Sequence, residues 1–244
     1  MPAANLTHLL YIVKMSMLAW FSPHLGVDLT MDLSLLTYYA LLSVSFVMSL
    51  LVRRKTQYVP LFVALLATAV LTEFFAAIIH RVDDTPESYN LVYHLYVMID
   101  YSITMLIFGH FIVSEKLKKV LRWSITLFLA ICLFFVFKDT FYSHPGVSLN
   151  ISGTVVILLS VYTLFQIRPH EHQNIFQQPI FWFCTGWIIY YAMTYIFNFL
   201  YDYLREVQGE EQTEQLQKYI SRTANYLLYS AFIIGFSCLR WMRK

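Results

Sequence analysis

Ionisable side chains lie inside apolar stretches of this sequence that are long enough to cross a membrane. The stretch NLVYHLYVMIDYSITMLIFGH, residues 90–110, places Asp100 near its middle and His94 six residues earlier. Glu73 and His80 belong to the preceding apolar stretch. A charge at the centre of a bilayer costs roughly 2.5–3.5 kcal/mol on insertion scales, and such residues mark functional sites by default.

Helical spacing places these groups on common faces with tyrosine and amide side chains. Residues three, four or seven positions apart share one face of a helix, as Glu73 and His80 do, and as Tyr96 and Asp100 do. At ~1.5 Å per residue, Asp100 lies about 15 Å below the outer surface. We predict that these faces turn toward one outward-facing polar pocket with a ligand-binding set of Glu73, His80, Tyr93, His94, Asp100, Tyr191, Asn198, Arg222 and Asn225.

Two interpretations of this polar set stay open. In the structural one, Glu73 pairs with Arg222, while Asp100 is neutral or bonds to tyrosine hydroxyls and Asn225; such bonds hold membrane helices together. In the functional one, the same groups line a hydrated cavity that binds a small ligand or a proton.

The elements that carry these residues are predicted to be transmembrane helices. Of the 244 residues, 58% are hydrophobic and 13% are charged, against roughly 25% charged in soluble domains. Only helices and closed barrels satisfy the backbone in lipid, and the alternation of barrel strands is absent. The sequence predicts an all-α, seven-transmembrane-helix bundle in one domain, 31–244, with spans at 33–52, 58–80, 90–113, 119–137, 149–167, 178–203 and 218–241.

The distribution of basic residues predicts the orientation of the bundle. The links after the first, third and fifth spans, together with the C-terminal tail, hold eleven Lys and Arg residues, and the other side holds six. Basic residues favour the cytoplasmic side. We therefore expect a multi-pass protein of the bacterial inner membrane, with the N-terminus outside and the C-terminus in the cytoplasm.

Two segments lie outside this scheme. Residues 1–30 contain the short apolar run LLYIVKMSMLAWF, which predicts an interfacial helix or a non-native extension before a start at Met31. The segment LREVQGEEQTEQLQ, residues 204–217, is acidic and rich in glutamine. It predicts that the last two helices continue beyond the membrane and meet in a solvated hairpin.

The sequence lacks the motifs of several protein classes. The net charge of +2 does not suit a nucleic-acid binder, no cofactor fingerprint is present, and the last span has no lysine for a retinal Schiff base. The topology resembles seven-helix zinc hydrolases of the ceramidase and adiponectin-receptor type, with Glu73, His80, His94 and Asp100 as candidate ligands. Their HxxxH pair on the last helix is replaced here by NYLLYSAF, so no metal is assigned.

The segments QPIFWFCTGWIIYYAMTYIFNFL and YNLVYHLYVMIDYSI resemble small uncharacterised seven-helix membrane proteins of Bacteroidetes-type bacteria. Some members of that group are encoded beside sensor kinases, so the resemblance implies an envelope location and a role in sensing. Our leading hypothesis is a non-enzymatic, receptor-like sensor that contacts the lipid bilayer and a cytoplasmic or membrane protein partner. The alternatives are a membrane-embedded metal-dependent lipid hydrolase and a small transporter or accessory subunit.

Overall fold

The structure is a computed structural model that describes residues 33–82, 86–139, 146–167 and 174–241, without the side chains of residues 80–90, 138, 139, 202, 210 and 214. The chain divides into two units, Met1–Leu36 and Thr37–Lys244. The first unit contributes only Leu33–Leu36, the first turn of a helix that continues into the second unit. The interfacial helix or extension predicted for residues 1–30 lies outside the described residues.

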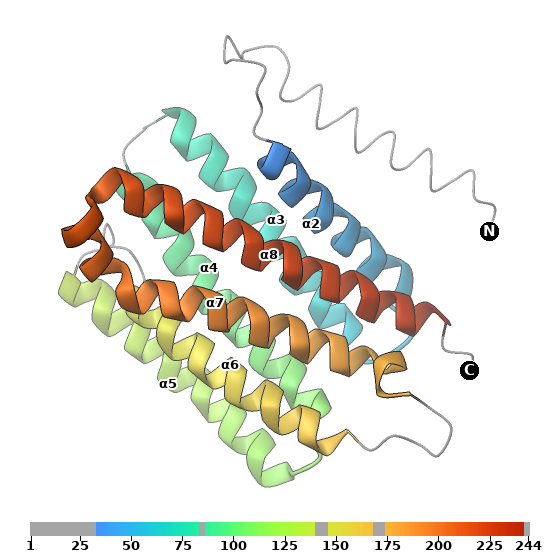
Figure 1. Cartoon of the computed structure of the whole chain (residues 1–244). Coiled ribbons are helices and arrows are strands. Elements are labelled where there is room, and N and C mark those ends of the chain that lie inside the picture. The colour runs from blue at the N-terminus through green and yellow to red at the C-terminus, as the bar shows by residue number, and fades with distance from the viewer. Residues whose placement is uncertain (1–32, 83–85, 140–145, 168–173, 242–244) are drawn as a thin grey trace. The chain divides into compact units, whose positions relative to one another are not determined.

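The described residues form helices and no strand, which confirms the all-α class. Seven α-helices and one 3-10 turn follow one another in Figure 1: α2 (Leu33–Val52), α3 (Val59–Val82), α4 (Pro86–Phe111), α5 (Glu115–Asp139), α6 (Gly146–Gln166), η1 (Ile175–Gln177), α7 (Pro179–Gln208) and α8 (Glu210–Trp241). Each of the seven predicted segments therefore corresponds to one α-helix.

Local sequence explains where several helices begin and end. Pro86 and Pro179 open α4 and α7, where the missing N–H of proline leaves no helical hydrogen bond unmade. Ser114 precedes α5, and its Oγ accepts the backbone N–H of Leu117 at 3.5 Å. Gly209 separates α7 from α8 with a φ of 89°, a conformation that glycine adopts without strain. The last two helices thus meet in a hairpin, as predicted.

Short links join most consecutive helices of the second unit, so neighbours in sequence run antiparallel (Figure 1). Helix α4 is central, because it packs against α3, α5 and α6. Helix α7 lies between α6 and α8 and contacts both along its length. The faces of α3, α4, α6, α7 and α8 that look inward can therefore contribute to one interior.

Six of these helices are long and apolar enough to cross a membrane: Leu33–Val52, Val59–Ile79, Leu91–Phe111, Glu115–Phe137, Gly146–Gln166 and Pro179–Tyr201. Large apolar side chains also lie on the surface of the second unit. Trp123, Phe137 and Phe165 are 68%, 81% and 87% exposed, and such an apolar surface suits contact with lipid. The chain therefore has the helices of a multi-pass membrane protein.

Aromatic rings fill the interior where α3 and α7 begin and where α4 and α8 end. We call this cluster the aromatic wall; its members are Phe62, Phe108, Phe183, Trp187, Phe232 and Phe236, each at most 3% exposed. The rings of Phe62 and Phe183 are 4.3 Å apart, and those of Phe108 and Trp187 are 5.0 Å apart. Contacts at these distances stabilise beyond the area that they bury, so the wall is a well-packed part of the core.

Candidate functional site

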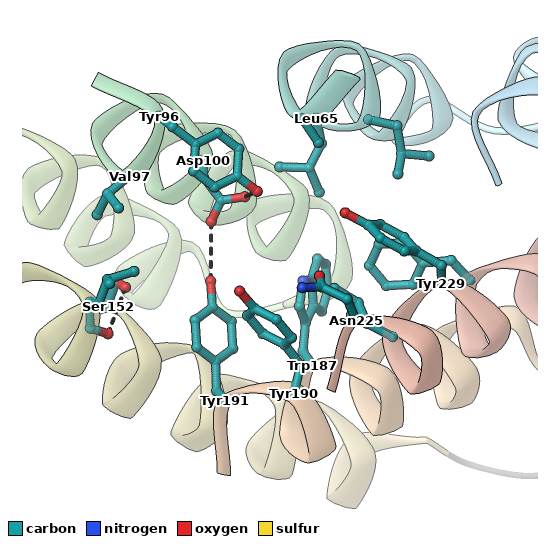
Figure 2. A pocket seen from close by; sticks show the side chains of 15 residues that line it. Leu65, Tyr96, Val97, Asp100, Ser152, Trp187, Tyr190, Tyr191, Asn225 and Tyr229 are labelled. Carbon is teal, nitrogen blue, oxygen red and sulfur yellow. Dashed lines mark hydrogen bonds between the residues drawn. The ribbon is translucent and has the colours of Figure 1, made fainter. Parts of the chain in front are cut away.

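Asp100 lies on the inward face of α4 and links this helix to α7. The hydroxyl of Tyr96, one turn earlier on α4, donates to Asp100 Oδ1 at 3.3 Å. The hydroxyl of Tyr191 on α7 donates to Oδ2 at 3.1 Å (Figure 2). Each carboxylate oxygen therefore has a phenol donor, and the bond from Tyr191 joins two helices through residues that are 91 positions apart in sequence. The prediction that Asp100 bonds to tyrosine hydroxyls is confirmed.

Asp100 borders a small cavity enclosed by five helices, which we call the polar cavity. Its volume is about 30 Å³. Its polar lining comes from α4, α6, α7 and α8 (Figure 2): Tyr96, Asp100, Ser152, Tyr190, Tyr191, Asn225 and Tyr229. Its apolar lining, including Leu65 and Leu66 of α3, comes from all five helices. A buried water needs roughly 10–15 Å³, so the cavity holds about two, whereas organic ligands occupy pockets of roughly 300–1,000 Å³.

Glu73 on α3 belongs to a neighbouring polar contact. The hydroxyl of Tyr38 on α2 donates to Glu73 Oε1 at 2.8 Å. The ring of Tyr38 also lies 5.9 Å from the ring of Tyr229, which lines the polar cavity. Tyrosine rings therefore extend from one carboxyl group toward the other, and the two acids have separate phenol donors.

The structure gives Glu73 a different partner from the predicted one. Arg222 is not within ion-pair distance of Glu73 among the described residues, and the carboxyl group bonds to Tyr38 instead. The predicted salt bridge fails because sequence spacing fixes the face of a helix but not which neighbour supplies the donor.

Three of the nine predicted site residues line the polar cavity: Asp100, Tyr191 and Asn225. The side-chain amide of Asn225 donates to the backbone oxygen of Ser221 at 2.9 Å. The described donors to Asp100 are Tyr96 and Tyr191, and the bond considered between Asn225 and Asp100 is not among them. Asn225 thus contributes to the cavity wall, while its amide N–H bonds to a backbone oxygen of the same helix, α8.

The other predicted residues whose side chains the structure describes do not line the cavity. His94 is buried, at 5% exposure, while Tyr93, Asn198 and Arg222 are partly exposed. The side chain of His80 lies outside the described residues. The described members of the predicted set therefore divide into a central group around Asp100 and side chains elsewhere in the bundle.

Sequence spacing missed the contributions of α6 and α2. Ser152 of α6 and Tyr190 of α7 line the cavity, and Tyr38 of α2 bonds to Glu73. A signal for α6 was present, because its buried polar residues recur at helical intervals: Ser148, Ser152, Ser160 and Thr163. Small residues of this kind mark helix contacts in membranes.

The described side chains contain no group of three or more His, Cys, Asp or Glu residues that could hold a metal ion. Of the four candidate zinc ligands, Glu73 and Asp100 both bond to tyrosine hydroxyls. The described part of the site is therefore a cluster of phenols and separate carboxyl groups.

Comparison with known proteins finds no relative of this chain. No protein-family model, curated protein or solved structure matches the chain. The function proposed below therefore depends on the residues of the site and on the arrangement of the helices.

Proposed function

We propose that the chain is a non-enzymatic, receptor-like sensor of the inner membrane, in which a proton at Asp100 changes the packing of α4 against α7. The observation that carries this proposal is the pair of phenol bonds to Asp100 beside the polar cavity. One of these bonds joins two helices, so a change in the carboxyl group acts directly on their contact.

The size of the polar cavity favours a proton over an organic ligand. A volume of about 30 Å³ admits about two water molecules. Water next to a carboxyl group can deliver or remove a proton without any larger opening of the bundle. A small organic ligand, the other option considered for this polar set, would need the helices to separate before it could bind.

Protonation changes the hydrogen bonds that Asp100 can make. An ionised carboxylate is only an acceptor and can receive both Tyr96 and Tyr191. A neutral carboxyl group carries a proton on one oxygen and becomes a donor there. The phenol at that oxygen must then accept this proton or donate to a remaining lone pair, so the geometry of its bond changes. The bond of Tyr191 carries such a change from α4 to α7. The proposed signal is this change in helix packing, passed along α4 to the basic end of α5, where a protein partner would dock.

We further propose that α8 is a seventh span and that the bundle has its N-terminus outside and its C-terminus in the cytoplasm. Helix α8 packs along α7 and supplies Asn225, Tyr229 and Phe232 to the cavity lining. The α2–α3 link, the first turns of α5 and the end of α8 are rich in basic residues: Arg53, Arg54, Lys55, Lys116, Lys118, Lys119, Arg122 and Arg240. This pattern supports a cytoplasmic position for these ends.

The proposal is tested by infrared difference spectroscopy of the full chain in lipid nanodiscs, between acidic and alkaline buffer. The wild-type protein should show a carboxylic-acid C=O band that decreases in the Asp100→Asn variant. The band should shift in Tyr191→Phe, which removes one hydrogen bond to the same group. Glu206→Gln, a substitution at an exposed position, is the matched control and should leave this band unchanged.

Thermal unfolding over the same pH range completes the test. If Asp100 controls helix packing, part of the pH dependence of the unfolding temperature should disappear in Asp100→Asn and remain in Glu206→Gln. An Asp100→Asn variant with the infrared band and pH response of the wild type would overturn the sensor proposal. Stoichiometric zinc in the purified protein would instead support the hydrolase alternative.

A further inference from the structure

A groove lies between the end of α2 and the start of α3. Leu50 and Val63 line it together with Pro60, and Arg53 and Arg54 complete its lining; its volume is about 330 Å³. Leu50 and Val63 belong to candidate membrane spans, and the two arginines directly follow the first of these spans. The groove therefore combines an apolar part at membrane depth with two guanidinium groups at the membrane edge.

The backbone of the α2–α3 link is held close to the ends of both helices. The N–H groups of Arg53 and Lys55 donate to the oxygens of Leu50 and Val52 at 3.4 and 2.8 Å. At the other end of the link, the ring of Tyr58 lies 5.1 Å from that of Phe111. These contacts keep the arginine backbone at the groove and limit the conformational entropy that binding would remove.

The positive charge of this link is uncompensated in the described part of the chain. No Asp or Glu occurs between residues 33 and 72, and no described carboxyl group forms an ion pair with Arg53 or Arg54. Both side chains are exposed. An arginine guanidinium binds phosphate oxygens through two parallel hydrogen bonds, so the two side chains suit a phosphate group.

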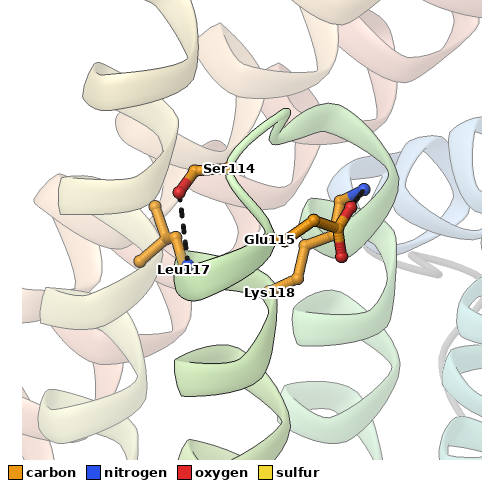
Figure 3. A network of polar contacts seen from close by, with 4 residues as sticks. All are labelled: Ser114, Glu115, Leu117 and Lys118. Carbon is orange, nitrogen blue, oxygen red and sulfur yellow. Dashed lines mark hydrogen bonds and ion pairs between the residues drawn. The ribbon is translucent and has the colours of Figure 1, made fainter.

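The basic segment at the start of α5 does have a carboxylate partner. At the start of α5, Lys118 Nζ lies 2.7 Å from Glu115 Oε1 (Figure 3). A carboxylate there already neutralises one of the basic side chains. The start of α5 is therefore a less favourable phosphate site and provides an internal control.

We propose that the groove lined by Leu50, Arg53, Arg54, Pro60 and Val63 binds the headgroup of an anionic phospholipid. The phosphate lies against Arg53 and Arg54, and the first part of an acyl chain lies along Leu50 and Val63. The rest of the lipid continues over the apolar surface of the bundle. An anionic lipid is favoured over a zwitterionic one because Arg53, Arg54 and Lys55 form an uninterrupted basic run beside a membrane span. This proposal is independent of Asp100 and of the sensing function.

The test is a titration of the full chain, purified in mild detergent, with phosphatidylglycerol, phosphatidylcholine or inorganic phosphate. The unfolding temperature reports binding, because a ligand that binds the folded state stabilises it. Phosphatidylglycerol should give a saturable increase, whereas phosphatidylcholine and inorganic phosphate should give little. No saturable increase with phosphatidylglycerol, or an equal increase with inorganic phosphate or phosphatidylcholine, would overturn the proposal.

Two pairs of substitutions locate the site. Arg53→Gln with Arg54→Gln should raise the half-saturating phosphatidylglycerol concentration about thirtyfold. Lys116→Gln with Lys119→Gln removes the same charge from the α5 end and should change it little. Equal weakening in both pairs would indicate general surface attraction and overturn the groove. Arg53→Lys with Arg54→Lys keeps the charge for folding and should still weaken binding, because it removes the guanidinium fork; binding as in the wild type would count against the proposal.

Discussion

Gly153 of α6 and Tyr191 of α7 approach so closely that a Cβ added to Gly153 would lie 2.9 Å from Cδ1 of the tyrosine ring. The same ring carries the hydroxyl that donates to Asp100. A glycine on α6 therefore permits the position of the phenol that links α7 to α4. Close approach through small residues is a common device of helix packing in membranes.

The first prediction follows from this approach. Gly153→Ala should displace the Tyr191 ring and weaken its bond to Asp100. The free energy of unfolding should fall by about 1–3 kcal/mol, the usual effect of overpacking a core. Thermal or denaturant unfolding in a fixed lipid or detergent measures the change.

The control for this substitution is Gly109→Ala on α4. A Cβ at Gly109 would meet nothing within 4 Å, so alanine there should be neutral or stabilise the helix by about 0.5–1 kcal/mol. Equal destabilisation by both alanines would show that the Gly153–Tyr191 approach is not what limits the substitution.

The second prediction concerns the bond between Tyr38 and Glu73. A double-mutant cycle with Tyr38→Phe and Glu73→Gln should give a coupling free energy of about 0.5–3 kcal/mol, as found for residues in direct contact. Tyr162→Phe on α6 is the matched control, because its side chain is 39% exposed and, among the described side chains, forms no hydrogen bond with Glu73. Its coupling to Glu73→Gln should be near zero, and a near-zero coupling for Tyr38 would contradict the described bond.

The third prediction concerns the orientation of the bundle and the span proposed for α8. In a chain whose native cysteines are replaced by alanine, single cysteines are introduced by Lys55→Cys, Glu206→Cys and Arg240→Cys. A thiol reagent that cannot cross membranes should label the Glu206→Cys variant in cells whose outer membrane has been permeabilised. The other two variants should react only after the inner membrane is disrupted. Labelling of Arg240→Cys together with Glu206→Cys would show that α8 does not cross.

The helices were predictable because apolar runs and their punctuation are local features. The run 33–52 coincides with α2, and Pro179, the second residue of the sixth predicted segment, is the first residue of α7. The helix α8 begins eight residues before its predicted span, at Glu210, because the polar residues of this stretch are good helix formers and continue the helix past the apolar part. Hydrophobicity predicts which part of a helix lies in the membrane, whereas helix propensity predicts how far the helix itself extends.

The site was predictable only in part, because the spacing that places residues on one face of a helix does not identify the neighbouring helix that this face contacts. The spacing of Tyr96 and Asp100 placed both on one face of a helix, and Tyr191, named in the same predicted set, bonds to Asp100. The partner of Glu73 comes from 35 positions away, and a charge-based choice selected Arg222 instead of a phenol. Long-range pairing depends on how helices rotate against one another, which periodicity does not fix.

The aromatic wall has a consequence for what this bundle can exchange with its surroundings. Trp187 and Phe232 belong both to the wall and to the lining of the polar cavity, and the rings behind them are fully buried. In the proposed orientation, this places a packed layer of aromatic side chains between Asp100 and the cytoplasm. A proton that enters from the periplasm would return by the same route, so the protein could monitor acidity in one compartment without dissipating the proton-motive force.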